Sequence, residues 1–136
     1  MGAHGCNPHQ SEDPVAAAAA VVSGVHQIVS RVVEPSETAV ISIGYINGGK
    51  AFNVIPDEVT LGGTIRLTDP DTQFAPLFET ISSRVKDIAS GYGCSAEVID
   101  RNGEASLNSR GEEFKVRPPL PIVVRSAADH RRSVPA

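Results

Sequence analysis

The sequence predicts an α+β fold in which two helices cover one face of an antiparallel sheet. Three observations in the 136-residue chain support this fold. Apolar residues recur every three or four positions in two segments, which begin near residues 14 and 71. Segments rich in alternating apolar residues follow each of them. Glycine and proline residues separate these segments, so the predicted order is helix, strand, strand, helix, strand.

The first helix is expected to begin at Pro14, directly after Asp13. An N-cap aspartate accepts hydrogen bonds from free backbone N–H groups, and a proline at the first helical position has no N–H to satisfy. The helix is expected to end at Pro35. Its apolar face has spacings of three, four and seven and comprises Val15, members of the alanine run Ala16 to Ala20, Val21, Val22, Val25, Ile28, Val29 and Val32.

An antiparallel hairpin is expected between the two helices. Its first strand spans Thr38 to Ile46, with Ala39, Ile41, Ile43 and Tyr45 on one face. Asn47-Gly48-Gly49 is typical of a hairpin turn, because Asn and Gly tolerate positive φ. The return strand reaches Leu67 and is interrupted at Pro56, which cannot donate to a ladder. Alternation beyond Pro56 places Arg66 on the face away from the apolar residues.

The second helix is expected to begin near Asp71 and to end at Gly91 and Gly93, before a last strand from Cys94 to Ile99. This order lacks only an initial strand to be β-α-β-β-α-β, the ferredoxin-like split βαβ sandwich. We therefore predict that sandwich with its first strand missing. Because that strand is central, its absence would expose backbone groups and apolar helix faces, unless the run from Ile122 to Arg125 fills the vacancy.

The composition changes near residue 100 and divides the chain into residues 1–100 and 101–136. The first part has 12 acidic and 5 basic residues, net −7, and the second has 4 and 7, net +3. The sequence from Arg117 to Pro121 contains three prolines and is typical of polyproline II or open loop. We expect residues 101–136 to be largely disordered, with Ile122 to Arg125 as the one candidate strand.

Charge and hydropathy exclude two classes of partner. The formal net charge is −4, which argues against nucleic acid, because a phosphate-backbone binder needs a basic surface. A ferredoxin-like RNA binder is also disfavoured, since the strands lack paired exposed aromatic residues. No apolar run approaches the roughly 20 residues of a membrane-spanning helix. We therefore expect neither nucleic acid nor a membrane as a partner.

Cysteine and histidine residues alone define no site. Cys6 and Cys94 lie in no metal-binding spacing, and two free thiols are favoured over one disulfide. His4 and His9 lie in a polar loop, where solvated side chains are the simpler explanation and a metal site would need further ligands. The sequence contains no phosphate-binding loop, serine-nucleophile elbow or HExxH motif.

Four motifs together resemble the lid domain of the co-catalytic metallohydrolases related to aminoacylases and glutamate carboxypeptidases. They are residues 2–9 (GAHGCNPH), 13–17 (DPVAA), 47–57 (NGGKAFNVIPD) and 62–66 (GGTIR). The version here is most similar to the plant enzymes that hydrolyse amino-acid conjugates of the auxin indole-3-acetic acid. The resemblance covers about residues 2–99, and Ala3 departs from the family's usual second glycine.

The resemblance implies roles for three residues. In that family the lid mediates dimerisation, while a separate catalytic domain holds the divalent metal ions, manganese or zinc. The motifs that bind them are not in this sequence, so no cofactor is expected within this chain. His4 matches the lid histidine that reaches into the partner subunit's active site and stabilises the oxyanion. Asn53 matches an asparagine that hydrogen-bonds substrate, and Arg66 matches the arginine that holds the substrate's carboxylate.

The resemblance also implies a function for the protein to which this domain belongs. We expect part of an amidohydrolase that cleaves N-acyl amino acids, with indole-3-acetyl amino acids as substrates. We expect a homodimer, or a heterodimer with related hydrolase chains, and no catalysis by the isolated chain. The plant enzymes are typically found in the endoplasmic reticulum lumen, although the first residues here lack a signal-peptide pattern. The alternative is a truncated, non-catalytic module that docks through its sheet edge onto full-length relatives.

Overall fold

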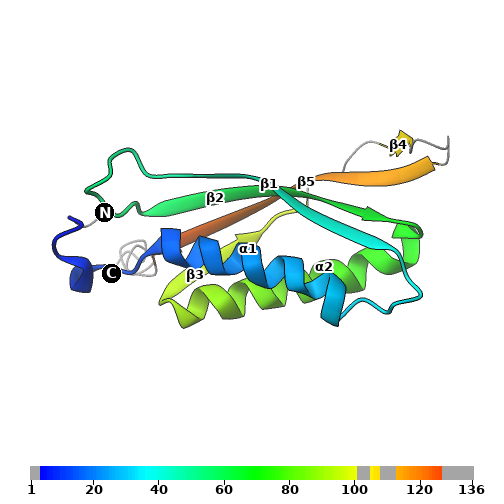
Figure 1. Cartoon of the computed structure of the whole chain (residues 1–136), viewed down its shortest axis with the longest axis horizontal. Coiled ribbons are helices and arrows are strands. Elements are labelled where there is room, and N and C mark those ends of the chain that lie inside the picture. Colours follow the sequence, from blue (N-terminus) through cyan, green and yellow to red (C-terminus); the bar gives the residue numbers. More distant parts are fainter. Residues whose placement is uncertain (1–3, 101–104, 108–112, 127–136) are drawn as a thin grey trace, which may run out of the picture.

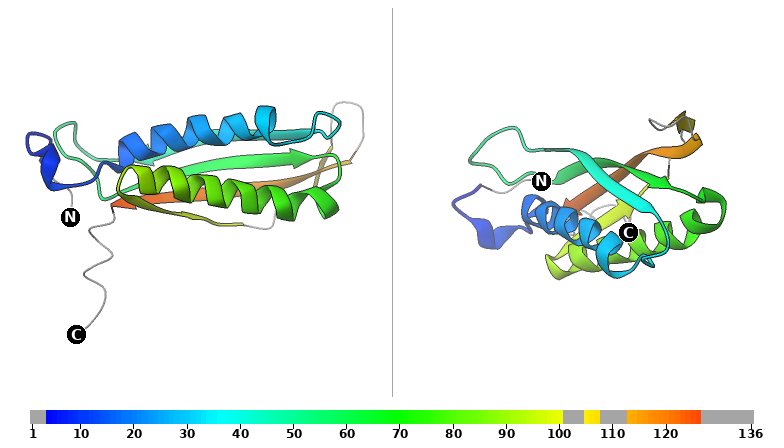
Figure 2. Two further views of the ribbon diagram at one scale, coloured as in Figure 1. Left: turned by 90° about the horizontal axis from the view of Figure 1, so that it is seen from below. Right: turned by 45° about the vertical axis from the view of Figure 1, so that its right-hand side comes forward.

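Two helices lie on one face of an antiparallel sheet, as the sequence predicts (Figures 1 and 2). The computed structural model describes residues 4–100, 105–107 and 113–126, and the side chains of residues 4–100 and 122–126. The elements are the short 3₁₀ helix η1 (Pro8–Gln10), α1 (Pro14–Arg31), β1 (Ala39–Gly48), β2 (Glu58–Leu67), α2 (Pro70–Gly91), β3 (Cys94–Val98), β4 (Ala105–Leu107) and β5 (Glu113–Ser126). No helix in the described part of the chain is long and apolar enough to cross a membrane.

The start of α1 confirms the predicted cap. The Asp13 carboxylate accepts hydrogen bonds from the backbone N–H groups of Val15 and Ala16, at 2.9 and 3.2 Å. The buried face of α1 is shorter than expected, because Val15 in its first turn and Val32 directly after its last residue are each 46% exposed. Ala17 and Ala18, from the alanine run near the start of α1, are fully buried in the core.

The hairpin of β1 and β2 differs from the expected pattern at one residue. Ala39 and Ile41 are buried as predicted, but Tyr45 is half-exposed. The pairing register shifts between Ile43 and Tyr45, and such a bulge reverses the face on which later residues lie. The ring of Tyr45 instead covers Gly62, where an added Cβ would stand 2.0 Å from a ring carbon. The glycine pair in the GGTIR motif is therefore explained partly by close packing across the hairpin.

Strand β5 occupies the central place that the split βαβ order leaves vacant. The strand order is β1-β2-β5-β3, and β5 is antiparallel to both neighbours (Figure 1). The run from Ile122 to Arg125 lies within β5 and fills the vacancy. The expectation of disorder therefore does not hold for Glu113–Ser126, nor for Ala105–Leu107, which pairs with β5 as β4. For the rest of residues 101–136, that expectation lies outside the described residues.

Prolines explain why the sequence pattern of β5 was misleading. Pro118, Pro119 and Pro121 cannot donate to a ladder, so a strand through them is unexpected. Among the described strands, β3 pairs only with residues 122–126 of β5, so the prolines lie where β2 alone is the partner. The register with β2 also shifts in this region. A segment with one unpaired edge tolerates proline better than a fully central one.

The core lies between the helices and the inner face of the sheet. Both helices contribute a buried stripe, and all four strands of the main sheet contribute aliphatic side chains or, in β3, a cysteine. Its buried apolar residues are Ala17, Ala18, Val21, Val25, Ile28, Ala39, Ile41, Val59, Leu61, Ile65, Leu67, Phe74, Leu77, Ile81, Val85, Ala89, Cys94, Ile122 and Val124. The core is therefore almost entirely aliphatic, and β5 is part of it.

Candidate functional site

The structure brings the segments of His4 and Asn53 together. The backbone N–H of Gly5 donates to the carbonyl oxygen of Asn53 at 2.8 Å, and His4 forms an antiparallel bridge with Val54. The N-terminal segment thus pairs with the loop of residues 49–57, which connects β1 to β2. Figure 1 shows both at the end of the sheet where β2 begins. His4 and Asn53 are both exposed, so their side chains are accessible from outside this domain.

Gly5 has a role that was not predicted from the sequence. A Cβ at this position would lie 3.2 Å from the Asn53 carbonyl oxygen, which is tighter than ordinary side-chain packing. The next turn is closed by a hydrogen bond from the Asn7 N–H to the His4 carbonyl oxygen at 2.8 Å. A glycine directly after a candidate catalytic histidine is a signal of close backbone approach, and it could have indicated this contact.

Arg66 lies far from the other two candidate residues. It is exposed near the last residue of β2, opposite Val40 of β1, on the face away from the helices. At about 3.4 Å per residue in an antiparallel strand, the eight steps from Glu58 to Arg66 span about 27 Å. The loop that carries Asn53 precedes Glu58, so it lies at the opposite end of the strand (Figure 1). Within one chain, the structure therefore does not bring Arg66 to His4 or Asn53.

The loop of residues 49–57 has a distinct surface. A hollow of about 400 Å³ opens beside it and is lined mainly by Lys50, Ala51, Val54, Ile55, Pro56 and Glu58. Phe52 precedes Asn53, and its side chain is fully exposed. A large aromatic residue without cover is suited to contact with another molecule rather than to the core of this domain.

The described residues do not fit a metal centre. Over residues 4–100 and 122–126 there is no group of three or more His, Cys, Asp or Glu side chains that could hold an ion. Both thiols are free, with Cys6 exposed and Cys94 buried. Burial raises the pKa of the Cys94 thiol, and the nearby carboxylates of Glu12 and Asp13 raise it further. A thiol held in its neutral form is a poor nucleophile and a poor ligand, so Cys94 is a core residue.

The fold and the candidate residues define a small two-layer α+β domain in which His4, Asn53 and Arg66 are all exposed. The family model described as a peptidase dimerisation domain matches residues 2–93. The chain belongs to this family, which confirms the resemblance drawn from the four motifs. Membership indicates association with another chain of the same or a related kind. Strand β5 lies beyond the matched residues.

Curated relatives are named as hydrolases. The chain is 38% identical over 107 residues to IAA-amino acid hydrolase ILR1-like 2 of Arabidopsis thaliana, covering 78% of this chain and 24% of that protein. It is 40% identical over 97 residues to N-acetyldiaminopimelate deacetylase of Bacillus licheniformis, covering 71% and 26%. The chain thus spans about a quarter of the length of these relatives.

A solved structure is similar as well. It is the crystal structure of a protein of methicillin-resistant Staphylococcus aureus assigned as an aminohydrolase, with a TM-score of 0.63 and 34% sequence identity. The similarity covers 68% of this chain and 24% of that one. The predicted α+β fold is confirmed by the two helices and the antiparallel sheet of this chain and by this structural neighbour.

Proposed function

We propose that this chain is the lid and dimerisation part of an amidohydrolase that cleaves N-acyl amino acids. The observation that carries the proposal is the placement of the candidate residues at two ends of one sheet. His4 and Asn53 share one end, and Arg66 lies at the other. Family membership and the names of the relatives support the same class of reaction.

The chemistry of amide hydrolysis gives each residue a role. Attack on the amide carbonyl builds negative charge on its oxygen, and an imidazole N–H from His4 would stabilise that oxyanion. The side-chain amide of Asn53 would donate to the bound substrate beside it. The guanidinium of Arg66 would bind the free carboxylate of the amino-acid part, because its planar fork matches a carboxylate better than an ammonium does.

The distance between these residues supports a site that is formed by two chains. The part of β2 between the two ends spans about 27 Å, which exceeds the length of a small N-acyl amino acid, so one lid would not present all three residues to one substrate. In a dimer, His4 and Asn53 of one chain would reach the active site of its partner. Each site would then combine Arg66 of one chain with His4 and Asn53 of the other. Dimerisation would then be a condition for activity and not only for stability.

The substrates proposed are indole-3-acetyl amino acids. One relative is named an IAA-amino acid hydrolase, and another is named a deacetylase of an N-acetylated amino acid. Both substrates share an acyl group in amide linkage to an amino acid with a free carboxylate. The fully exposed Phe52, beside Asn53, favours an aromatic acyl group such as indole-3-acetyl. A divalent metal, manganese or zinc, would belong to the catalytic domain.

A second candidate function is a non-catalytic module that associates with full-length relatives. The observation that favours it is the position of β1 at one end of the strand order. An edge strand presents backbone N–H and C=O groups that a second strand can pair with. Val40 and Ile46 on this strand are about half exposed, which adds apolar area to such a contact.

The test is a graft of residues 2–99, which include β3, into a full-length dimeric relative in place of the matching part of its lid, while the relative keeps its own first lid strand. One subunit carries His4→Ala, and the other lacks the glutamate that activates water. If His4 acts across the dimer, one site keeps both an intact glutamate and an incoming His4, and about half the activity of the unmutated graft returns. The two corresponding homodimers serve as controls and should both be inactive. No recovery in verified heterodimers would refute action across the dimer, and no activity in the unmutated graft would favour the non-catalytic module.

A further inference from the structure

The gap between β2 and β3 is filled by a strand from the far end of the sequence. On one side, residues 122–126 of β5 pair with residues 98 to 94 of β3. On the other side, residues 122–125 pair with residues 61 to 58 of β2. Each residue from Ile122 to Arg125 therefore has a partner on both sides. Figure 2 shows β5 between the two neighbouring strands, beneath the helices.

The side chains of residues 122–126 alternate between the buried face and the outer face of the sheet. Ile122 and Val124 are fully buried, and Ser126 is 6% exposed. Val123 and Arg125 are partly exposed and point to the opposite face. The inner residues complete the same core that α1, α2 and the other strands form. Without them, apolar side chains of α1, which packs against β5, would be left uncovered.

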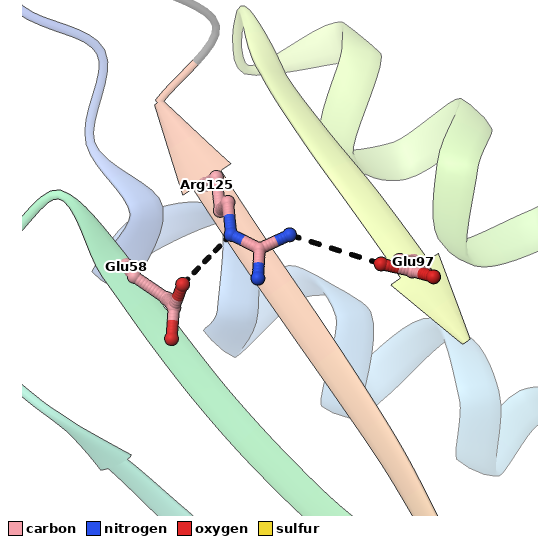
Figure 3. Close-up of polar contacts among 3 residues, drawn as sticks. All are labelled: Glu58, Glu97 and Arg125. Carbon is pink, nitrogen blue, oxygen red and sulfur yellow. Dashed lines mark hydrogen bonds and ion pairs between the residues drawn. The ribbon is translucent and has the colours of Figure 1, made fainter. Parts of the chain in front are cut away.

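An arginine on the outer face joins three strands. The Nε–H of Arg125 donates to Oε2 of Glu58 on β2 at 2.7 Å (Figure 3). Its Nη1 lies 3.8 Å from Oε2 of Glu97 on β3. A register shift by one residue would carry this charged side chain to the buried face. The two carboxylates therefore select a cation at this one position of the incoming strand.

The last residue of β5 meets the start of the first helix. Ser126 donates its backbone N–H to the Asp57 carbonyl oxygen at 3.0 Å, and its hydroxyl bonds to the carboxylate of Glu12. Glu12 directly precedes the N-cap of α1. A strand that led straight into α1 would end at this same place and run in this same direction. In the split βαβ order, that strand is the first one.

We propose that the gap between β2 and β3 is a strand-binding site, and that β5 occupies it in place of the strand that precedes α1 in the split βαβ order. The central strand of the sheet then comes from a segment that follows both helices and the other strands of the main sheet in sequence. The site takes an extended segment with the pattern of residues 122–126. This pattern has apolar residues at the positions of Ile122 and Val124, a basic residue at the position of Arg125 and a small polar residue at the position of Ser126. Strand β5 and any strand entering from upstream of residue 1 exclude each other.

The experiment compares the full chain with a chain that ends at residue 112. The full chain should unfold in one cooperative transition, and the shortened chain should lose that transition or self-associate. A synthetic peptide of residues 113–126 should restore the transition with one peptide per chain. The proposal is overturned if the shortened chain has the same Tm as the full chain, or if the peptide binds without restoring the transition.

Two matched peptides test the fit of side chains to the gap. Val124→Thr places a hydroxyl in the core and should weaken peptide binding about tenfold. Val123→Thr makes the same change on the outer face and should alter binding less than about threefold. If the two substitutions weaken peptide binding equally, the proposal is contradicted. A non-specific apolar contact would lose the same affinity at either valine.

The full chain provides a second test if the shortened chain does not remain in solution. Val124→Thr should lower the hydrogen-exchange protection of β3 amides from Cys94 to Val98, while Val123→Thr leaves it unchanged. Arg125→Glu should lower the same protection, and the double variant Arg125→Glu, Glu58→Arg should restore part of it. Unchanged protection of β3 in both the Val124→Thr and Arg125→Glu variants would overturn the proposal.

Discussion

The backbone N–H of Gly5 donates to the carbonyl oxygen of Asn53 at 2.8 Å, across 48 positions of sequence. This hydrogen bond ties the segment that carries His4 to the loop that carries Asn53. Both side chains remain exposed, so the contact positions them without covering them. The two candidate residues are therefore presented as one unit at one end of the sheet.

Replacing Gly5 should disturb this unit without unfolding the domain. In Gly5→Ala the added Cβ would stand 3.2 Å from the Asn53 carbonyl oxygen, so the two segments must move apart. We expect backbone amide chemical-shift changes concentrated at residues 4–7 and 51–54 in nuclear magnetic resonance spectra of the chain. Gly91→Ala is the matched control, since a Cβ there meets nothing within 4 Å. Equal changes at residues 51–54 in both variants would contradict the close approach.

His4→Ala and Arg66→Ala should have different kinetic effects in the grafted enzyme. The proposed contact of His4 forms with the oxyanion, so its loss should lower kcat by about 100- to 1000-fold. Arg66 would bind a carboxylate that is present in both ground and transition states, so its loss should mainly raise KM. Steady-state kinetics of both variants distinguish the roles. A large rise in KM with unchanged kcat for His4→Ala would exclude oxyanion stabilisation.

Phe52 should influence the choice of acyl group. Its side chain is fully exposed beside Asn53, so Phe52→Ala costs the fold little and removes an aromatic surface. An aromatic contact contributes about 0.5–1.5 kcal/mol, so kcat/KM for an indole-3-acetyl amino acid should fall by about two- to tenfold. The acetyl derivative of the same amino acid serves as the control and should change little. Equal losses for both substrates would show that Phe52 does not contact the acyl group.

The two cysteines should differ in reactivity and in their effect on stability. Because burial and nearby carboxylates raise the pKa of Cys94, its thiolate fraction near pH 8 is low, and iodoacetamide should modify exposed Cys6 first. The folded-state pKa lies above the unfolded one, so stability is unaffected below the unfolded pKa of about 8.5 and falls as pH rises through the folded value.

Thermal unfolding between pH 7 and pH 10 measures this loss of stability. Cys94→Ala is the reference, since it removes the titrating group, and the difference in Tm between the two chains should change with pH. A difference that stays constant across the range would contradict a raised pKa.

The isolated chain should neither bind a metal ion tightly nor hydrolyse substrate. Its described residues hold no cluster of three ligands, and a tight zinc or manganese site needs at least that many. Elemental analysis after incubation with either metal and removal of the excess should find no stoichiometric ion. One or more ions retained per chain, together with turnover of an indole-3-acetyl amino acid, would refute this expectation.

Local patterns in the sequence were sufficient for most of the fold. The cap at Asp13 depends on residues two and three positions away, and the buried stripe of α2 depends on spacings of three and four. Such relations lie within one element, so a single sequence contains them. The four motifs likewise indicated the family, and they named His4, Asn53 and Arg66 as candidates.

Only the tertiary structure determined where the candidates lie and what completes the sheet. The sequence distance between Asn53 and Arg66 is small, but β2 runs between them and separates them by its length. Tyr45 left its expected face because a bulge near Gly44 reversed the alternation. Strand β5 lies in the sheet because it pairs with β2 and β3, and its prolines are untypical of a strand, so it was not predicted over its full length. Pairing between distant segments is a property of the folded chain, and it leaves no periodic signal in the sequence of either segment.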